Sequence, residues 1–422
     1  MPQPIARPSR HRAPLARLAL ALALACAAPL AAQAAQCPLT DVPEADAWAL
    51  HSRVISIDTH IDIDTRYASA QHDPGGFTRG QNDLPKMRAG GLDAAFLILY
   101  TGQGKLDADG YRGAREQAER LFQGIQRMVR AYPDQVGLAT SADDVLALHA
   151  QGKRAVLIGM ENAYPLGASV ADVPMWAARG VRYVGLTHMG NNQFGGSSNP
   201  NAELGDPPED PGLTPLGREL VAALNDAGIM VDISHVGHRT MLEAARLSRA
   251  PLIASHSGVM GVHRNLRNLE DDQLDAIRAS GGVAQMVAFR DYVAEIDPAI
   301  RDGQKALREK YFPEGWAKAS PEAGAAYQAE VLALRQQHRD VSLAQYVDHI
   351  DYAVRRIGIE HVGIASDFDG GGGVAGWDDT SQGANVTREL MRRCYTEDQI
   401  RALWGGNLLR VMRQVQAKAK PR

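Results

Sequence analysis

Eight short runs of apolar and β-branched residues, spread between residues 53 and 369, constrain the fold more than any other feature of the chain. They read RVISIDTH, LDAAFLILY, RAVLIGME, VRYVGLTH, GIMVDISH, APLIASH, GVAQMVAF and HVGIASDFD. Segments with helical periodicity separate most of them, which indicates repeated strand–helix–strand units with parallel strands. Eight such strands favour an α/β fold of the (β/α)8 TIM-barrel type over an open doubly wound sheet.

Two of the intervening helices have recognisable ends. In LTPLGRELVAALNDAG, Thr214 is a suitable N-cap, Pro215 fits the first helical position and Gly228 suits the exit. In SLAQYVDHIDYAVRRIG, Ser342 precedes apolar residues at helical spacing, and Gly358 ends the run. Each helix leads directly into a predicted strand.

One segment between the seventh and eighth strands is too long for an ordinary connection. Residues 290–341 are polar, and their pattern predicts helix. We therefore expect a helical excursion at this point of the barrel. Two placements fit the sequence, a cover over the barrel mouth and a surface decoration.

The first 35 residues have the layout of a secretory signal peptide. Four arginines, Arg7, Arg10, Arg12 and Arg17, precede the run LALALALACAAPLAA, and small residues follow. Residues 36–422 would then form a single barrel domain in the periplasm or outside the cell. Cys26 is a poor match to a lipoprotein cleavage site, so export without a lipid anchor is favoured. Cys37 and Cys394 could form a disulfide there.

Composition excludes two classes of partner. A formal net charge of -4 supplies no basic surface for nucleic acid. Beyond the leader the chain has no long apolar stretch, and its end, VQAKAKPR, is charged, so neither a membrane span nor a C-terminal lipid-anchor signal is expected. The 45% of hydrophobic residues supply ample material for a core.

Ionisable residues gather at the ends of the predicted strands. In VISIDTHIDID, four of them alternate with apolar residues and would share one face: Asp58, His60, Asp62 and Asp64. A solvated edge strand would explain this run taken alone. Five further runs, however, also end in such residues, namely Glu161, His188, His235, His256 and Asp367. Barrel enzymes place their chemistry at this carboxyl-end rim.

Imidazoles and carboxylates at one rim suit zinc and similar divalent ions. A single histidine at a strand end is more often structural, but five candidate ligands at one rim are hard to explain separately: His60, Asp62, Glu161, His235 and His256. The first two are close enough in sequence to reach one ion, and the last two could hold a second with the glutamate between them. Such a pair of ions would polarise a carbonyl and lower the pKa of the attacking water.

Several longer stretches carry a family resemblance. They are IDTHID, GMEN, VGLTHMGNN, GLTPLGRELVAALNDAGIMVDISHVG, LIASHS, RNLEDDQL, VGIASDFDGG and WGGNLLRV. In this order, from about residue 53 to 413, they resemble the membrane dipeptidase (renal dipeptidase) family, a branch of the amidohydrolase barrel superfamily. The resemblance implies hydrolysis of dipeptides into amino acids, and it is compatible with a homodimer.

The resemblance also implies a binuclear zinc site. One Zn²⁺ would be held by His60 and Asp62, the other by His235 and His256, with Glu161 bridging them. Manganese and cobalt suit the same ligand types.

Three further residues take roles in substrate binding and catalysis from the resemblance. His188 would help to bind or polarise the substrate carbonyl, and Arg267 would hold the C-terminal carboxylate. Asp367 would handle the substrate amino group and proton transfer. An exported enzyme of this kind would meet dipeptides with a C-terminal D-residue from cell-wall turnover.

The neighbouring ionisable residues have weaker interpretations. Asp58 would orient His60 or cap a turn, and Asp64 and Asp369 are expected outside the ligand set. Three further histidines lie in predicted helices or loops and are expected to be solvated: His238, His263 and His349. After Glu161 the chain reads NAYPLG, where the animal enzymes carry a glycine–histidine pair, so the preferred dipeptide does not follow from the resemblance.

Two other functions remain open at this point. Another barrel amidohydrolase, such as an N-acyl amino acid deacylase or a lactonase, would keep the five ligands but tolerate loss of Arg267 or Asp367. A barrel that has lost catalysis and serves as a binding module would lack ligands. None of the expected ligand types is missing from the sequence.

Overall fold

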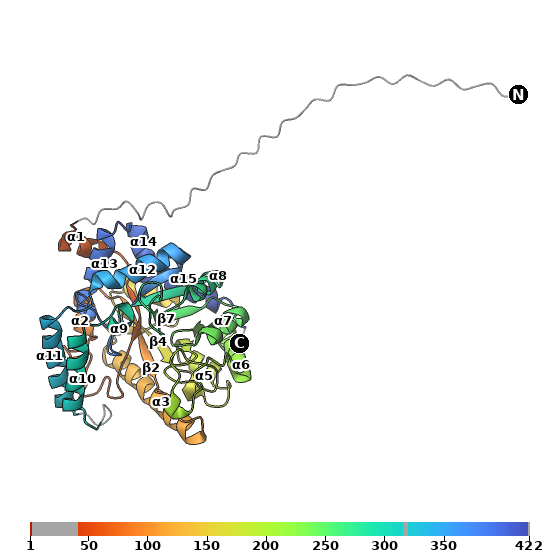
Figure 1. The fold of residues 1–422 in the computed structure, drawn as a ribbon. Coiled ribbons are helices and arrows are strands. Elements are labelled where there is room, and N and C mark those ends of the chain that lie inside the picture. Colours follow the sequence, from red (N-terminus) through yellow and green to blue (C-terminus); the bar gives the residue numbers. More distant parts are fainter. Residues whose placement is uncertain (2–40, 315–319, 421–422) are drawn as a thin grey trace. The chain divides into compact units, whose positions relative to one another are not determined.

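The computed structural model describes Met1, residues 41–314 and residues 320–420, and a parallel barrel dominates it. Eight parallel strands follow one another around the nearly closed barrel (Figure 1). In order around the barrel they are β1 (Ile57–Ile61), β2 (Ala94–Tyr100), β4 (Arg154–Glu161), β5 (Val181–Gly185), β6 (Met230–Asp232), β7 (Ile253–Ser257), β8 (Val283–Val287) and β9 (Val362–Ala365). These are the eight predicted runs, and the (β/α)8 fold class is confirmed.

The barrel closes between its first strand and the segment that follows its last strand. The backbone N–H of Asp62 donates to the carbonyl of Phe368 at 2.9 Å, and the N–H of Asp367 donates to the carbonyl of His60 at 3.1 Å. Ile61 forms a parallel bridge with Phe368. The bonds that close the barrel therefore involve residues expected in the site.

One strand lies off the barrel. β3 (Val136–Leu138) pairs in parallel with β4 alone and was not among the predicted strands. With only three residues, β3 is too short to show the alternation of apolar and polar residues that identifies a strand in sequence.

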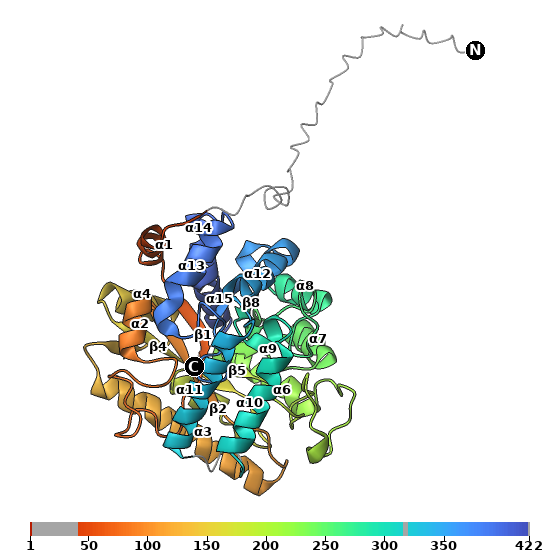
Figure 2. The ribbon, with the colours of Figure 1, turned by 60° about the vertical axis from the view of Figure 1, so that its left-hand side comes forward.

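Helices surround the strands, as the view in Figure 2 shows. They are α1 (Glu44–His51), α2 (Leu84–Gly90), α3 (Ala108–Ala131), α4 (Ala142–Ala150), α5 (Val173–Ala178), α6 (Pro215–Ala227), α7 (His238–Leu247), α8 (Asp271–Ala279), α9 (Arg290–Val293), α10 (Pro298–Tyr311), α11 (Pro321–Gln337), α12 (Leu343–Ile357), α13 (Gly383–Arg392), α14 (Glu397–Arg401) and α15 (Asn407–Gln416). The two N-caps that the sequence predicts, Thr214 and Ser342, are confirmed. Thr214 caps α6 by accepting from the N–H of Gly217 at 3.0 Å, and Ser342 caps α12.

The predicted excursion is the segment that holds α9, α10 and α11, between β8 and β9. α10 and α11 form a hairpin with a small apolar cluster of its own, made by Phe312, Tyr327 and Val331. In Figure 2 this hairpin lies in front of the ring of helices, and in Figure 1 it lies at one side of the barrel.

One buried arginine joins the two ends of the excursion. Arg290, the first residue of α9, donates to both carboxylate oxygens of Asp340 at 2.8 and 2.9 Å, and to Asp378 at 2.7 Å. It also donates to the carbonyl of Gly373 in the loop after β9. The excursion therefore begins and ends beside the loops that carry the predicted site.

Some expectations fall outside the described residues. The leader, residues 1–35, lies there apart from Met1, so the boundary between residues 35 and 36 stays a prediction. Cys394 is disulfide-bonded, whereas its expected partner Cys37 belongs to the part of the chain that the structure does not describe. Within the described ranges, no helix has the length and apolarity needed to cross a membrane.

Candidate active site

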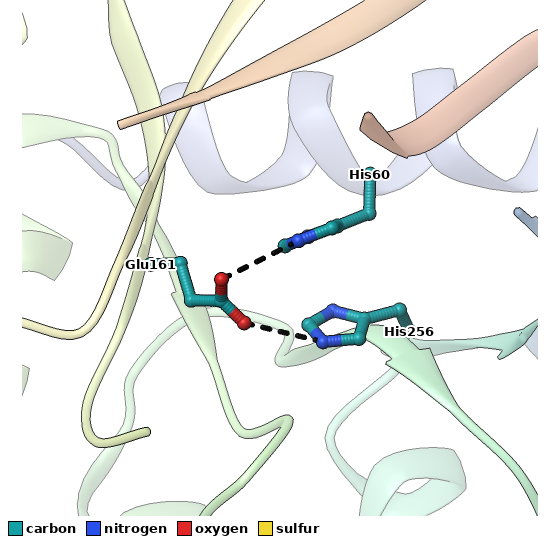
Figure 3. Close-up of side chains that lie close together, drawn as sticks. All are labelled: His60, Glu161 and His256. Carbon is teal, nitrogen blue, oxygen red and sulfur yellow. Dashed lines mark ion pairs between the residues drawn. The ribbon is translucent and has the colours of Figure 1, made fainter. Parts of the chain in front are cut away.

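Glu161 lies at the centre of the predicted ligands. As the last residue of β4 it is buried, and its Oε1 lies 3.0 Å from His235 Nε2 and 3.3 Å from His256 Nε2. Its other oxygen, Oε2, lies 3.5 Å from His60 Nε2. Figure 3 shows the carboxylate directing one oxygen toward each of His60 and His256. One carboxylate thus contacts histidines from three other strand ends.

His60 and Asp62 lie on the other side of this carboxylate. Asp62 Oδ2 is 3.8 Å from His60 Nε2, and Asp367 Oδ1, from the loop after β9, is 4.0 Å from the same nitrogen. Gly370 packs against both carboxylates, since a Cβ atom there would lie 2.2 Å from Asp62 Oδ2 and 2.3 Å from Asp367 Oδ1. Only glycine allows the loop to approach this closely.

His188 and Arg267 line the edge of the same cluster. His188 Nε2 is 3.9 Å from Glu161 Oε1, and its ring meets the ring of Tyr100 edge-on with centroids 4.9 Å apart. The buried guanidinium of Arg267 donates to the carbonyl of His256 at 3.2 Å and lies 5.1 Å from the ring centre of Tyr292. The structure therefore brings all eight predicted site residues to one end of the barrel.

Backbone strain is concentrated at the same place. Three non-glycine residues of the site region adopt left-handed conformations: Asn162 at φ 70°, His235 at φ 66° and Asp367 at φ 61°. Such conformations cost of order 1–3 kcal/mol each and persist where the surrounding structure imposes them. The surrounding structure therefore holds the backbone of these turns in a conformation that the residues would not adopt on their own.

The pKa values of the central pair are strongly perturbed. Burial raises the pKa of Glu161, but the charges of His60 and His188 and the hydrogen bonds from the other histidines outweigh it and hold that pKa well below its usual range. Burial likewise lowers the pKa of His60, yet the charges of Glu161 and Asp62 outweigh it and raise that pKa to about 10. In the metal-free site both groups therefore favour their charged forms, and a metal ion bound at His60 Nε2 would displace the proton from that nitrogen.

The other groups favour their neutral forms. Burial, reinforced by nearby carboxylates, raises the pKa of Asp62 well above its usual range and that of Asp367 to about 7. Burial also lowers the pKa of His235 and His256 well below the ordinary value for histidine, and it lowers that of His188. Three carboxylates crowded into one buried site repel each other, and a cation among them relieves the repulsion.

The donor set fits divalent metal ions. The Nε2 atoms of His235 and His256 face each other at 2.9 Å, an arrangement that suits two lone pairs directed at one ion. His60 Nε2 and Asp62 Oδ1 are buried and have no hydrogen-bond partner among the described residues. The ligand atoms of three overlapping groups lie within 4.8 Å of one another: His60, Glu161 and His256; Glu161, His188 and His235; and His60, Asp62 and Asp367.

The neighbouring residues take up other tasks. Asp58 accepts from the backbone N–H groups of His60 and Ser366, both at 3.1 Å, so it joins β1 to the β9 end and does not touch the imidazole. Asp64 pairs with Arg66 at the surface. Asp369 accepts from the N–H groups of Gln81 and Asn82 in a loop contact. Asp64 and Asp369 thus lie outside the cluster, as expected.

One sequence interpretation fails here, and one residue beside the site was missed. His349 is fully buried rather than solvated, since its nitrogens bond to the N–H of Val259 and the carbonyl of Val293. Tyr183, which hydrogen-bonds to His60 Nδ1 at 2.9 Å, was not singled out at all. Its parity with Val181 and Gly185 in β5 could have placed it on an inward face, but its partner on another strand is not visible in sequence.

Comparison with known proteins agrees with this geometry. Residues 44–422 match the family described as membrane dipeptidase (peptidase family M19). The dipeptidase tcpJ of Claviceps purpurea is 30% identical over 342 residues, which cover 80% of this chain and 70% of that protein. The dipeptidase ataJ of Aspergillus terreus is 31% identical over 358 residues, which cover 80% and 77%.

Solved structures give the same result. The probable dipeptidase PvdM from Pseudomonas aeruginosa is 36% identical and superposes with a TM-score of 0.79 over 89% of this chain and 99% of that one. A metallopeptidase from Rhodobacter sphaeroides, solved with a phosphinate mimic of the dipeptide L-Ala-D-Ala, shares the fold at 23% identity, with a TM-score of 0.68 over 86% and 99%. The chain therefore belongs to the membrane dipeptidase family, peptidase family M19, and is a metallo-dipeptidase.

Proposed function

We propose that this enzyme is an exported dipeptidase that uses two zinc ions to hydrolyse free dipeptides. The observation that carries the proposal is the position of Glu161, whose two oxygens face His235 and His256 on one side and His60 on the other. A bridging carboxylate between two ions needs this arrangement. His60 with Asp62 would hold one ion, and His235 with His256 the other; when bound, the ions supply carbonyl polarisation and acidification of water.

Arg267 is proposed to select substrates with a free C-terminal carboxylate. Its guanidinium is buried at the edge of the ligand cluster, and its Nε has no hydrogen-bond partner within the described ranges. A planar guanidinium binds a carboxylate through two parallel hydrogen bonds. The carboxylate of a dipeptide is one residue from the scissile bond, so this contact would limit the enzyme to very short substrates.

His188 and Asp367 are proposed to act on the reacting groups. His188 lies 3.9 Å from the central carboxylate, where its Nε2–H can donate to the substrate carbonyl oxygen. Asp367, whose pKa burial raises to about 7, can take a proton from the attacking water and pass it to the leaving amine. It is also close enough to His60 to contact the amino group of a substrate bound at that position.

The test is amino-acid release from a panel of L,L and L,D dipeptides by the purified chain, before and after chelation and after zinc is restored. We expect metal-dependent cleavage of free dipeptides and little cleavage of the same peptides with an amidated C-terminus. Cleavage of acylated amino acids or lactones, with none of any dipeptide by fully metallated enzyme, would overturn the proposal in favour of another amidohydrolase activity. The L,D members test the proposed acceptance of C-terminal D-residues.

Export is proposed from the leader-like residues 1–35 and is tested separately. When the full-length gene is expressed in a Gram-negative host, the mature protein should appear outside the cytoplasm, with an N-terminus near residue 36 by mass spectrometry. An unprocessed chain that stays in the cytoplasm would contradict the export proposal without affecting the dipeptidase activity.

A further inference from the structure

A buried polar layer lies inside the barrel directly below the ligand cluster. Four side chains from four strands form it: Thr59 of β1, Tyr183 of β5, Asp232 of β6 and Ser255 of β7, each at most 1% exposed. Barrel interiors are usually filled by branched apolar residues. Because polar groups are costly to bury unless they are hydrogen-bonded, their presence in this layer calls for a specific reason.

The hydroxyl of Tyr183 determines which nitrogen of His60 carries the proton. That hydroxyl donates to the carbonyl of Thr59 at 3.1 Å, because a carbonyl can only accept. Its contact with His60 Nδ1 at 2.9 Å must then be a hydrogen bond donated by Nδ1–H. The proton on Nδ1 leaves the lone pair on Nε2, which is the atom that faces Glu161 and Asp62.

A second chain of hydrogen bonds has the same effect on His256. Ser255 Oγ donates to the Asp232 carboxylate at 2.7 Å, and so it accepts from His256 Nδ1 at 2.8 Å. The carboxylate is held in place by the backbone N–H groups of Ser234 and Ser255, at 3.1 and 2.8 Å. His256 therefore also presents an unprotonated Nε2, and that atom faces His235 and Glu161.

The layer is built across the barrel. Thr59 Oγ1 donates to the carbonyl of Ser255 at 2.6 Å, which joins β1 to β7. The ring of Tyr183 occupies the space left by Gly159 of β4, where a Cβ atom would lie 2.3 Å from the tyrosine Cζ. By contrast, Nδ1 of His235 has no hydrogen-bond partner among the described residues. Only two of the three central histidines are held in this way.

We propose that Tyr183 and the Ser255–Asp232 pair are positioning residues that fix the Nδ1–H tautomers of His60 and His256, and thereby set the affinity of the two metal positions separately. Tyr183 serves the position of His60 and Asp62, and Asp232 acts through Ser255 on the position of His235 and His256. The inference rests on the proposed binuclear site. Partners of this kind orient a ligand and raise its basicity, and their loss typically lowers metal affinity 10- to 100-fold.

The test measures zinc affinity of the full mature chain by competition with a chromophoric chelator, which resolves two dissociation constants. The variant Asp62→Asn identifies the constant of the His60 position. Tyr183→Phe should then weaken this position roughly 10- to 100-fold and leave the other within about threefold. Tyr346→Phe is the matched control, because Tyr346 is equally buried and its hydroxyl donates to the carbonyl of Met286 and to none of the histidine ligands.

At the position of His235 and His256, comparing how much two substitutions weaken zinc binding distinguishes tautomer control from packing. Ser255→Ala removes one hydrogen bond to His256. Asp232→Asn places an amide N–H opposite Ser255 Oγ, which turns the serine proton toward His256 Nδ1 and favours the wrong tautomer. We therefore expect Asp232→Asn to weaken this position more than Ser255→Ala, although the first substitution is nearly isosteric.

Each outcome has a distinct meaning. If the wild-type chain binds fewer than two zinc ions, the proposed binuclear site fails, and this inference fails with it. If the wild-type chain binds two ions and the variants weaken both positions equally, or weaken neither, only the positioning role is overturned. Thermal unfolding of each variant without metal shows whether it is folded. A variant that unfolds early is replaced by Tyr183→Met or Ser255→Cys, which also lack the original hydroxyl.

Discussion

At the scale of single residues, the site is defined by side chains whose hydrogen-bonding capacity is only partly used by the protein. Arg267 donates one bond to the carbonyl of His256 and packs against Tyr292, while its Nε remains unpartnered among the described residues. A buried guanidinium with a free donor is costly to the folded chain alone. The proposed substrate carboxylate would use this free donor and remove that cost.

The substitution Arg267→Lys should separate charge from geometry. Lysine keeps the positive charge but cannot make two parallel bonds to a carboxylate. A charged hydrogen bond contributes roughly 1.5–3 kcal/mol, so we expect KM for a free dipeptide to rise about tenfold to a hundredfold with a smaller change in kcat. Steady-state kinetics check this, with the amidated dipeptide as the control. An equal loss for both substrates would show that Arg267 does not contact the carboxylate.

His349 should make stability depend on pH in a specific window. Burial lowers its pKa from 6.5 to about 4, so between these values the unfolded chain takes up a proton that the folded chain refuses. The free energy of unfolding is therefore unaffected by this group above pH 6.5 and falls as the pH drops toward 4, by up to about 3 kcal/mol. Urea unfolding at pH 7.5, 5.5 and 4.5 should show a shallower decline for His349→Gln than for the wild type.

The exposed His338 supplies the control for that series. His338→Gln should retain the wild-type slope. Equal slopes for the wild type and His349→Gln would mean that His349 is protonated in the folded chain.

The rim residues are predictable from sequence because each ends a recognisable strand. The expectation that His349 is solvated is wrong. That residue lies three positions after Tyr346 in α12, on the face that also carries Ile350 and Ala353. The helical spacing therefore predicts that His349 faces the core, whereas the usual exposure of histidine predicts the opposite and is wrong here. Tyr183 is a different case, because its role depends on a partner from another strand, and cross-strand contacts are absent from a single sequence.

At the scale of elements, one buried cation joins both ends of the helical excursion to the loop after β9. Arg290 bonds to carboxylates from both flanking segments, Asp340 and Asp378, as well as to a backbone carbonyl. The length and polarity of this segment predict the excursion. The ion pairs of Arg290 with Asp340 and Asp378 could not be predicted, because Arg290 and Asp378 lie 88 positions apart in sequence.

Arg290→Met should loosen the hairpin without unfolding the barrel. Removing one partner of a buried ion pair typically costs about 3–5 kcal/mol, and here the penalty falls on Asp340, whose side chain is only 12% exposed and would lose its partner. We expect faster proteolytic cleavage between residues 294 and 340, measured by limited proteolysis with mass spectrometry.

Arg356→Met is the matched control for the hairpin experiment. It removes an exposed pair with Asp275, which should contribute at most about 1 kcal/mol. A cleavage rate in the Arg290 variant equal to that of the control would show that the hairpin is held by other contacts.

At the scale of the whole molecule, the closed barrel and the ligand cluster depend on the same strand ends. The eight apolar runs in the sequence predict the barrel fold, and the polar residues at the ends of these runs predict that the site lies at the carboxyl-end rim. The barrel's interior did not follow, since the polar layer of Thr59, Tyr183, Asp232 and Ser255 depends on how strands meet across the axis.

Chelation should therefore destabilise the entire barrel. A ligand that binds only the folded chain stabilises it by about 2.7 kcal/mol when present at 100 times its dissociation constant. We expect a chelator to lower the unfolding temperature measured by calorimetry, and added zinc to restore it together with dipeptide hydrolysis. An unfolding temperature that is insensitive to chelator would contradict a metal site built into the folded barrel.

The closing seam of the barrel also imposes an order on biosynthesis. His60 lies in the first strand and Asp62 directly follows it. Asp367 and Phe368, which bond to their backbones, follow the last strand roughly 300 residues later. A ribosome must therefore make almost the whole chain before these backbone bonds can form. The nascent chain therefore cannot assemble its site until Phe368 has been made, because the first strand has no closing partner before that point.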